Sequence, residues 1–273
     1  MKKTVMMWIV AVSMMIAATA AFAQTRPGFA VGIERLNYGY SERFEGQTVA
    51  KDNGGFFGLN TAYTKTFGKK NFFRATLGID RGSIDYRSED GTQMHNVDQI
   101  FGRLELELGR DFTLENGTTI SPFIGIASGV LDDYSGGRGA DNGMQGYDRH
   151  VAYRYVPVGA AATFSMPGAT KLTVSGQYNW VRNGHVKSDF SKVDPELPDV
   201  DVPLAGGSGY EVAAMISVPL RNRMLSVGPF VSGWRINQSK EVTLTDPDSG
   251  DTLVLLEPAS RTTKVGLRVT FSF

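Results

Sequence analysis

The sequence predicts an all-β protein: a closed antiparallel transmembrane β-barrel of about ten strands that follows an N-terminal signal peptide. Three observations support this fold class. Apolar and polar residues alternate with period two, the period of a β-strand, from residue 29 to the C-terminus. Many alternating segments exceed the length of about five or six residues that is usual for soluble strands. Short and long connections follow one another in strict order between them.

The composition excludes several classes of function. The chain has 273 residues with 28 basic and 28 acidic side chains, so no positive excess points to nucleic acid. Aromatic residues make up 11%, which is too many for a disordered chain. Cysteine is absent, which excludes a disulfide scaffold, a thiolate metal site, a cysteine nucleophile and an acylated lipoprotein anchor. A mean hydropathy of −0.17 excludes a bundle of membrane helices.

Residues 1–23 are predicted to be a secretory signal peptide. Lys2 and Lys3 precede an apolar run, which ends at the cleavage pattern 21–23, Ala-Phe-Ala, before Gln24. The alternative is a membrane anchor, but the run is short for a span and no stop-transfer charges follow. We therefore expect the barrel to comprise residues 24–273.

The alternation defines two faces on each strand. In residues 100–108 the apolar side chains oppose the charged ones: Ile100, Leu104, Leu106 and Leu108 against Arg103, Glu105 and Glu107. Residues 72–80, 172–180 and 264–273 follow the same rule. We expect ten strands, near residues 29–40, 55–67, 71–86, 97–113, 118–130, 151–165, 170–182, 209–219, 225–238 and 261–273.

The connections between these strands differ in length. Those near 68–70, 114–117, 166–169 and 220–224 are short, whereas those near 41–54, 87–96, 131–150, 183–208 and 239–260 are long and polar. Outer-membrane barrels have tight periplasmic turns and longer external loops. An even strand count then puts both termini in the periplasm. The alternative, a soluble all-β protein, does not require connections sorted by length.

The signal peptide, the amphipathic strands and the C-terminal sequence Val269 to Phe273 together resemble bacterial outer-membrane β-barrel proteins. The resemblance implies an outer-membrane location, lipid as a partner, and recognition of Phe271 and Phe273 by the barrel-assembly machinery. Physical chemistry agrees, because strands can cross hydrocarbon only in a closed sheet that pairs every backbone group. Aromatic residues near strand ends are expected to form an interfacial girdle: Tyr38, Tyr40, Phe67, Phe72, Phe112, Tyr178, Trp180, Trp234, Phe271 and Phe273.

The inward faces are predicted to carry a network of charges of both signs. Its members are Glu34, Arg74, Arg103, Glu105, Glu107 and Arg268, with Asp80, Arg154, Glu211 and Lys264 as further inward candidates. We expect Arg74 to pair with Glu105 or Glu107, and Glu34 to pair with Arg268 where the barrel closes. A lumen of about ten strands is near the size that side chains fill. A salt-bridged plug is therefore favoured over a conduction pathway, which stays the alternative.

The loops offer no complete catalytic constellation. Omptins, which are outer-membrane proteases, have an Asp-His pair that faces an Asp-Asp pair; a similar pattern here would use Asp148, His150, Asp199 and Asp201. In omptins the acidic pair comes first along the chain, whereas here it follows. Neither His-x-Ser nor G-x-S-x-G occurs. We expect no catalytic residue, no metal site and no cofactor.

Residues 241–245 and 252–256 are predicted to form a hairpin that rises beyond the membrane. The acidic turn between them, 246–251, resembles a calcium loop, but it exchanges the residues at the loop's fifth and sixth positions.

Three functions compete at this stage. The first is a non-catalytic scaffold that displays loops for adhesion, recognition of an extracellular ligand or envelope integrity. The second is a narrow channel for small solutes, and the third is an omptin-like surface protease. Fold alone does not choose among them.

Overall fold

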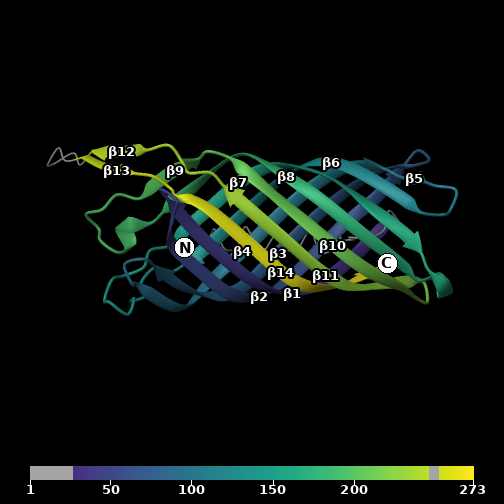
Figure 1. Cartoon of the computed structure of the whole chain (residues 1–273), viewed down its shortest axis with the longest axis horizontal. Coiled ribbons are helices and arrows are strands. Elements are labelled where there is room, and N and C mark those ends of the chain that lie inside the picture. The colour runs from purple at the N-terminus through teal and green to yellow at the C-terminus, as the bar shows by residue number, and fades with distance from the viewer. Residues whose placement is uncertain (1–26, 246–251) are drawn as a thin grey trace, which may run out of the picture.

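A computed structural model of the chain describes residues 27–245 and 252–273 (Figure 1). The predicted signal peptide and the turn 246–251 lie outside the described residues. In the described part of the chain, no helix is both long enough and apolar enough to cross a membrane.

Ten long strands of the described residues form a closed antiparallel barrel, as the sequence predicts. Their bounds are β1 Gly28–Phe44, β2 Gln47–Phe67, β3 Asn71–Ser88, β4 Gln93–Arg110, β6 Thr119–Tyr134, β7 Arg149–Ser165, β8 Lys171–Ser188, β10 Gly207–Leu220, β11 Arg223–Ile236 and β14 Ala259–Ser272. The order around the sheet is the order along the chain. β14 pairs with both β11 and β1, from Ala30 opposite Ser272 to Arg43 opposite Ala259, so the barrel has no open edge.

Six short elements join these strands. They are β5 Phe112–Thr113, the 3₁₀ turn η1 Pro167–Ala169, the 3₁₀ turn η2 Phe190–Lys192, β9 Val200–Leu204, β12 Val242–Thr245 and β13 Thr252–Leu255. β9 extends the sheet by pairing with the C-terminal part of β8, residues 184–188. β12 pairs with β13 in a separate hairpin, which confirms the predicted strands on either side of residues 246–251.

The two ends of the barrel differ. Long connections, β9 and the β12–β13 hairpin gather at one end, which we call the loop end, and the C-terminus lies at the opposite, turn end (Figure 1). The first two connections at the loop end are shorter than predicted. β1 and β2 continue to a turn at Glu45 and Gly46, where φ is 49° and 85°. These positive values are those of the tight hairpin turn that matches the twist of paired strands. Residues 41–54 and 87–96 are polar because they form strand that extends beyond the apolar surface, and not because they form loops.

Exposed apolar side chains from all ten long strands cover much of the outer face of the barrel, with single arginines such as Arg35 among them. Ile33 on β1 is 62% exposed. On β4, Leu104 and Leu108 are 44% and 56% exposed, whereas Glu105 and Glu107, which lie between these two leucines, are buried. The predicted faces of β3, β4, β8 and β14 are therefore confirmed. Such a surface would be unfavourable in water and is stable against lipid.

The structure corrects one inward charge and part of the girdle. Arg154 lies outside, because Tyr153 and Tyr155 occupy the inward positions of β7 on either side of it. Four of the expected girdle aromatics also belong to inward positions: Tyr38, Tyr40, Phe72 and Trp234. A narrow lumen needs large side chains to fill it, so aromatic residues occupy inward positions as well as the membrane interface.

The outer face yields a first prediction. Leu104→Arg should lower the free energy of unfolding in a bilayer by about 2–4 kcal/mol, the cost of an arginine near the bilayer midplane. Leu104 lies in the middle of the outward apolar run of β4. The control is Leu220→Arg at the turn end of β10, where the cost should be about 0–1 kcal/mol. Urea titration in lipid vesicles measures both, and equal costs would place Leu104 outside the hydrocarbon.

Candidate functional site

An ion-pair network crosses the middle of the lumen; we call it the lumen network. Arg268 on β14 donates from Nε to Glu34 Oε2 over 2.6 Å and from Nη1 to Glu211 Oε1 over 3.1 Å. Arg103 on β4 donates to the other oxygen of Glu211, also over 3.1 Å, and to Asn60 Oδ1 over 3.0 Å. Because β4 and β10 lie on opposite sides of the barrel, Glu211 joins two arginines from different walls.

Further polar contacts fill the same level. Tyr155 donates to Glu105 Oε1 over 2.7 Å, and Gln177 donates to the same oxygen over 3.3 Å. Lys264 Nζ lies 3.0 Å from Asp80 Oδ2 and 3.7 Å from the centre of the Phe101 ring. A cavity at this level, lined by Glu34, Arg103 and Glu211 among others, has a volume of about 40 Å³. That volume holds no more than about three water molecules.

A second ion pair lies nearer the turn end. Arg74 Nε donates to Glu107 Oε2 over 2.5 Å, and the two side chains are 8% and 1% exposed. The Arg74 guanidinium also lies 5.1 Å from the centre of the Phe123 ring. A buried charge is tolerated only when such partners compensate for its lost hydration.

A third group, which we call the brace, crosses the lumen at the loop end. Arg149 on β7 pairs with Glu42 on β1 over 3.0 Å and with Glu257, which precedes β14. Tyr40 donates a further hydrogen bond to Glu42 Oε1 over 2.7 Å. β1 and β7 are diametrically opposed in the strand order, so the brace connects opposite walls of the barrel.

Two adjoining cavities, which we call the vestibule, lie between the lumen network and the loops. Their volumes are about 90 Å³ and about 200 Å³. Both are lined by Tyr40, Asp52, Asp133 and Arg149. The smaller one reaches down to Lys264, and the larger one is lined by residues of the 89–92 turn and of the β6–β7 connection. The vestibule is thus a chamber at the loop end with a closed floor.

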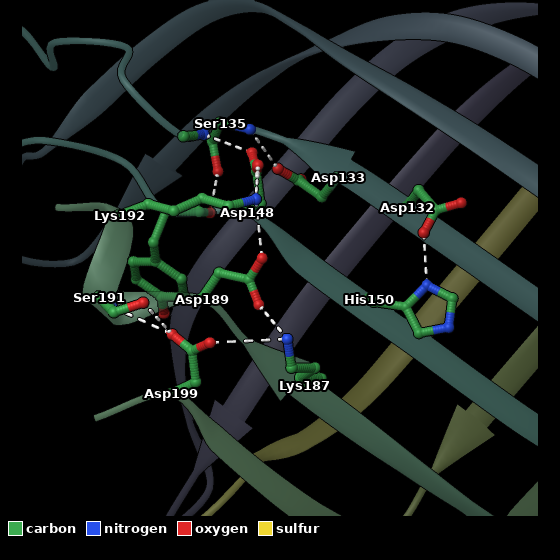
Figure 2. Close-up of polar contacts among 12 residues, drawn as sticks. Asp132, Asp133, Ser135, Asp148, His150, Lys187, Asp189, Ser191, Lys192 and Asp199 are labelled. Atoms are coloured by element: carbon green, nitrogen blue, oxygen red, sulfur yellow. Dashed lines mark hydrogen bonds and ion pairs between the residues drawn. The ribbon is translucent and has the colours of Figure 1, made fainter. Parts of the chain in front are cut away.

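The four residues of the possible protease pattern do not converge. His150 Nδ1 contacts Asp132 on the neighbouring strand, apart from the cluster around Asp148 (Figure 2). Asp148 accepts a hydrogen bond from the Gly136 backbone over 2.8 Å and pairs with Lys192 over 2.9 Å. The other two aspartates have partners elsewhere: Asp199 contacts Ser191 and Lys187, and Asp201 lies 3.6 Å from His185.

The β8–β9 connection is held by carboxylates at the loop end (Figure 2). Lys187 and Lys192 contact Asp189 over 2.7 Å and 2.8 Å, and hydrogen bonds from these two ammonium groups lower the pKa of the Asp189 carboxyl. Asp199 Oδ1 accepts from Ser191 Oγ and from its backbone N–H, and these bonds lower the pKa of the Asp199 carboxyl. Among the described residues, no group of three or more His, Asp or Glu side chains could hold a metal ion.

The proposed assembly signal lies at the turn end. The Phe273 backbone N–H donates to the Phe29 carbonyl over 2.7 Å, which ties the C-terminal residue to the start of β1. The Phe271 and Phe273 rings pack 5.2 Å apart between centres, and Phe273 is 53% exposed. The Arg223 guanidinium lies 4.8 Å from the Phe273 ring.

The structure brings together more residues than the sequence analysis named. Glu34, Arg74, Arg103, Glu105, Glu107 and Arg268 all face the lumen, and Glu211 is the acid that links the two central arginines. The sequence does not predict the brace, because Glu42, Arg149 and Glu257 lie in segments that it predicts to be loops. One signal was available: Tyr38, Tyr40 and Glu42 continue the inward phase of β1 into the segment 41–54.

Comparison with known proteins supports the fold. No protein-family model and no curated protein sequence matches the chain. The structure of the outer membrane protease OmpT from Escherichia coli is similar with a TM-score of 0.61 and 12% identity, over 94% of this chain and 100% of OmpT. The translocator domain of the autotransporter NalP from Neisseria meningitidis has a TM-score of 0.41 and 13% identity, over 98% and 97%. The toluene transporter TodX from Pseudomonas putida has a TM-score of 0.39 and 10% identity, over 96% and 93%.

The barrel and its neighbours define the class of protein. The chain has the closed antiparallel barrel fold of bacterial outer-membrane proteins, with a lumen crossed by ion pairs. At 12% identity the likeness to OmpT concerns the fold alone.

The lumen network yields a second prediction. Arg268→Ala should lower the free energy of unfolding by about 3–5 kcal/mol, because Glu34 would stay buried without its counter-charge. Adding Glu34→Ala should restore part of the loss. The control is Arg221→Ala in the exposed turn between β10 and β11, which should change little. Urea titration measures all three, and a double variant no more stable than Arg268→Ala would mean that the two charges are not coupled.

The β8–β9 connection yields a third prediction. A carboxyl whose pKa is lowered in the folded state adds stability above its ordinary pKa of about 3.9, and this stability is lost as the pH falls through the lowered value. The Ser191 amide, bonded to Asp199, should therefore keep its exchange protection from pH 7 to 5 and lose it below about pH 4. Hydrogen exchange, corrected for the intrinsic rate, measures this effect. The Asp111 amide, bonded to the Lys70 carbonyl, is the control and should stay protected. Loss of Ser191 protection near pH 6 would contradict the assignment.

Proposed function

We propose that the protein is a non-catalytic outer-membrane barrel that presents its loop end outside the cell for recognition, adhesion or envelope integrity. In this proposal residues 1–23 direct export, Phe271 and Phe273 are read by the barrel-assembly machinery, and both termini face the periplasm. Lipid contacts the outer face, and an extracellular ligand contacts the loop end.

The observation that carries the proposal is the lumen network. Arg103, Glu211 and Arg268 join strands on opposite sides of the barrel, and the cavity left at their level is about 40 Å³. A hydrated solute cannot pass such a level unless buried ion pairs separate, which costs several kcal/mol. A closed lumen leaves the loop end as the part of the molecule able to meet a partner.

The second candidate is a narrow channel. The observation that favours it is the stack of polar cavities along the barrel, from the level of the lumen network through the vestibule to the loops. If the side chains of the lumen network separated transiently, these cavities would form one path. The protease has no comparable support, because Asp148, His150, Asp199 and Asp201 each contact other residues.

The fourth prediction tests closure. In planar lipid bilayers the wild-type barrel should show no steady unit conductance, since the lumen network spans the lumen. The double variant Glu34→Ala and Arg268→Ala should leak, because it removes charge and volume from that level. The matched control, Arg35→Ala, changes a residue next to Glu34 whose guanidinium lies over the Phe57 ring on the outer face, and it should stay closed.

Other outcomes of this experiment decide between the alternatives. A stable, charge-selective wild-type current would reject the closed scaffold in favour of the channel. Peptide cleavage by the purified protein that is lost in His150→Ala would overturn both in favour of a protease.

A further inference from the structure

The vestibule has aromatic walls on two sides. Tyr38 and Phe101, from β1 and β4, have ring centres 5.2 Å apart on one side. Tyr153 and Trp234, from β7 and β11, have ring centres 5.2 Å apart on the other. The faces of such rings carry negative electrostatic potential and attract cations. Phe101 already holds one cation, since Lys264 Nζ lies 3.7 Å from its centre.

The charges that line the vestibule are mainly negative. Arg149 is bound by Glu42 and Glu257 together, and Lys264 is bound by Asp80. Asp133 therefore lines the chamber without a cation bound to it among the contacts of the described residues, and burial together with the Asp133 charge raises the pKa of the neighbouring Asp52 carboxyl to about 8. Asp133 receives hydrogen bonds only from neutral groups in the contacts described, the Gln99 amide over 2.7 Å and the Ser135 backbone over 3.1 Å.

The vestibule also has buried acceptor atoms without donors. The Oδ1 atom of Asp52 and the Oε1 atom of Gln99 have no hydrogen-bond partner among the described residues. Asp52 is 6% exposed and Gln99 is 1% exposed, and both line the smaller cavity. A buried acceptor without a donor has lost the hydrogen bonds that water would give it, and none of the described residues replaces them. A ligand that brings N–H donors into this cavity would supply those hydrogen bonds.

We propose that the vestibule binds a small organic cation that carries N–H donors: a primary ammonium or guanidinium group on a short apolar body. The cationic group lies between Asp52, Asp133 and the Gln99 carbonyl oxygen, and the apolar body packs against the aromatic walls. An anion is repelled by the Asp133 carboxylate, and a neutral solute gains no charge pairing with it. The inference deepens the proposed function, since a chamber with a closed floor retains a ligand and does not conduct it.

The experiment compares probes of one shape and different charge. n-Butylammonium, 1-butanol and butyrate share a four-carbon body, and each is titrated into the detergent-solubilised barrel. Trp180→Phe serves as the background, because it leaves Trp234 in the vestibule as the one tryptophan of residues 24–273. Trp234 fluorescence should change and saturate with n-butylammonium. It should not change with 1-butanol or butyrate at the same concentrations.

Two variants locate the cationic group. Asp133→Asn should weaken n-butylammonium binding about tenfold or more, the effect of losing a charged hydrogen-bond acceptor. Asp52→Asn should weaken it less, because binding must first ionise the Asp52 carboxyl, whose pKa is raised by burial. The matched control is Asp98→Asn, on the outer face beside Arg138, which should leave the affinity unchanged. Heat-modifiable gel mobility shows whether each variant is folded, and the comparison of the three probes needs no vestibule variant at all.

The outcomes separate this inference from the closure of the lumen. Selective binding of n-butylammonium that depends on Asp52 or Asp133 supports the inference. Equal binding of 1-butanol, no binding of n-butylammonium, or binding unaffected by both variants overturns it. Conductance of the same preparation tests the proposed function separately. A barrel that conducts would contradict the closed lumen, whereas a barrel that binds no n-butylammonium would contradict only this inference.

Discussion

Glu211 sits between two arginines that come from different walls of the barrel, and the arrangement of the lumen depends on this contact. Arg268 and Arg103 are each 3.1 Å from one of its oxygens. A guanidinium inside a narrow barrel loses most of its hydration and needs a partner within reach. Because Glu211 serves both, the two cations are held at the same level of the lumen. Glu34 accepts a further hydrogen bond from Arg268, and Asn60 accepts one from Arg103.

The two faces of each strand meet different environments, lipid outside and the polar lumen inside. Along β4, Leu104 and Leu108 face outward while Glu105 and Glu107 face inward. Lipid requires that no backbone group lacks a partner, which the closed sheet provides. The buried charges of the lumen network require partners of opposite charge, which its ion pairs provide. In each strand, alternate residues face the lipid with mostly apolar side chains, and the residues between them face the lumen.

Much of this arrangement could be predicted from the sequence, because each position of a barrel strand must choose between lipid and lumen. The period-two pattern predicted the ten strands, and contacts between neighbouring strands follow from register, as with Arg74 opposite Glu107. Contacts across the lumen could not be predicted. The tilt of the strands determines which residues of opposite walls share a level, and one sequence does not report that tilt. This is why the brace of Glu42, Arg149 and Glu257 is seen only in the structure, and why the sequence predicts that Glu211 faces the lumen but not that it contacts both arginines. The inward prediction for Arg154 is wrong because Tyr153 and Tyr155, which flank it, suit either face of the sheet. The sequence therefore does not determine which face of β7 points into the lumen.

The turn at Glu45 and Gly46 affects where the connections at the loop end can change in length. Both residues have positive φ in a two-residue connection between the paired residues Phe44 and Gln47, so an inserted residue would replace this turn geometry by that of a longer loop. The β3–β4 turn is similarly tight, whereas the β6–β7 and β8–β10 connections have irregular backbone that can take added length. Of the five connections at the loop end, the two between β1 and β4 are short turns and the three after β6 are long. Changes in length should therefore be accommodated more readily on the side of β6 to β14 than on the side of β1 to β4.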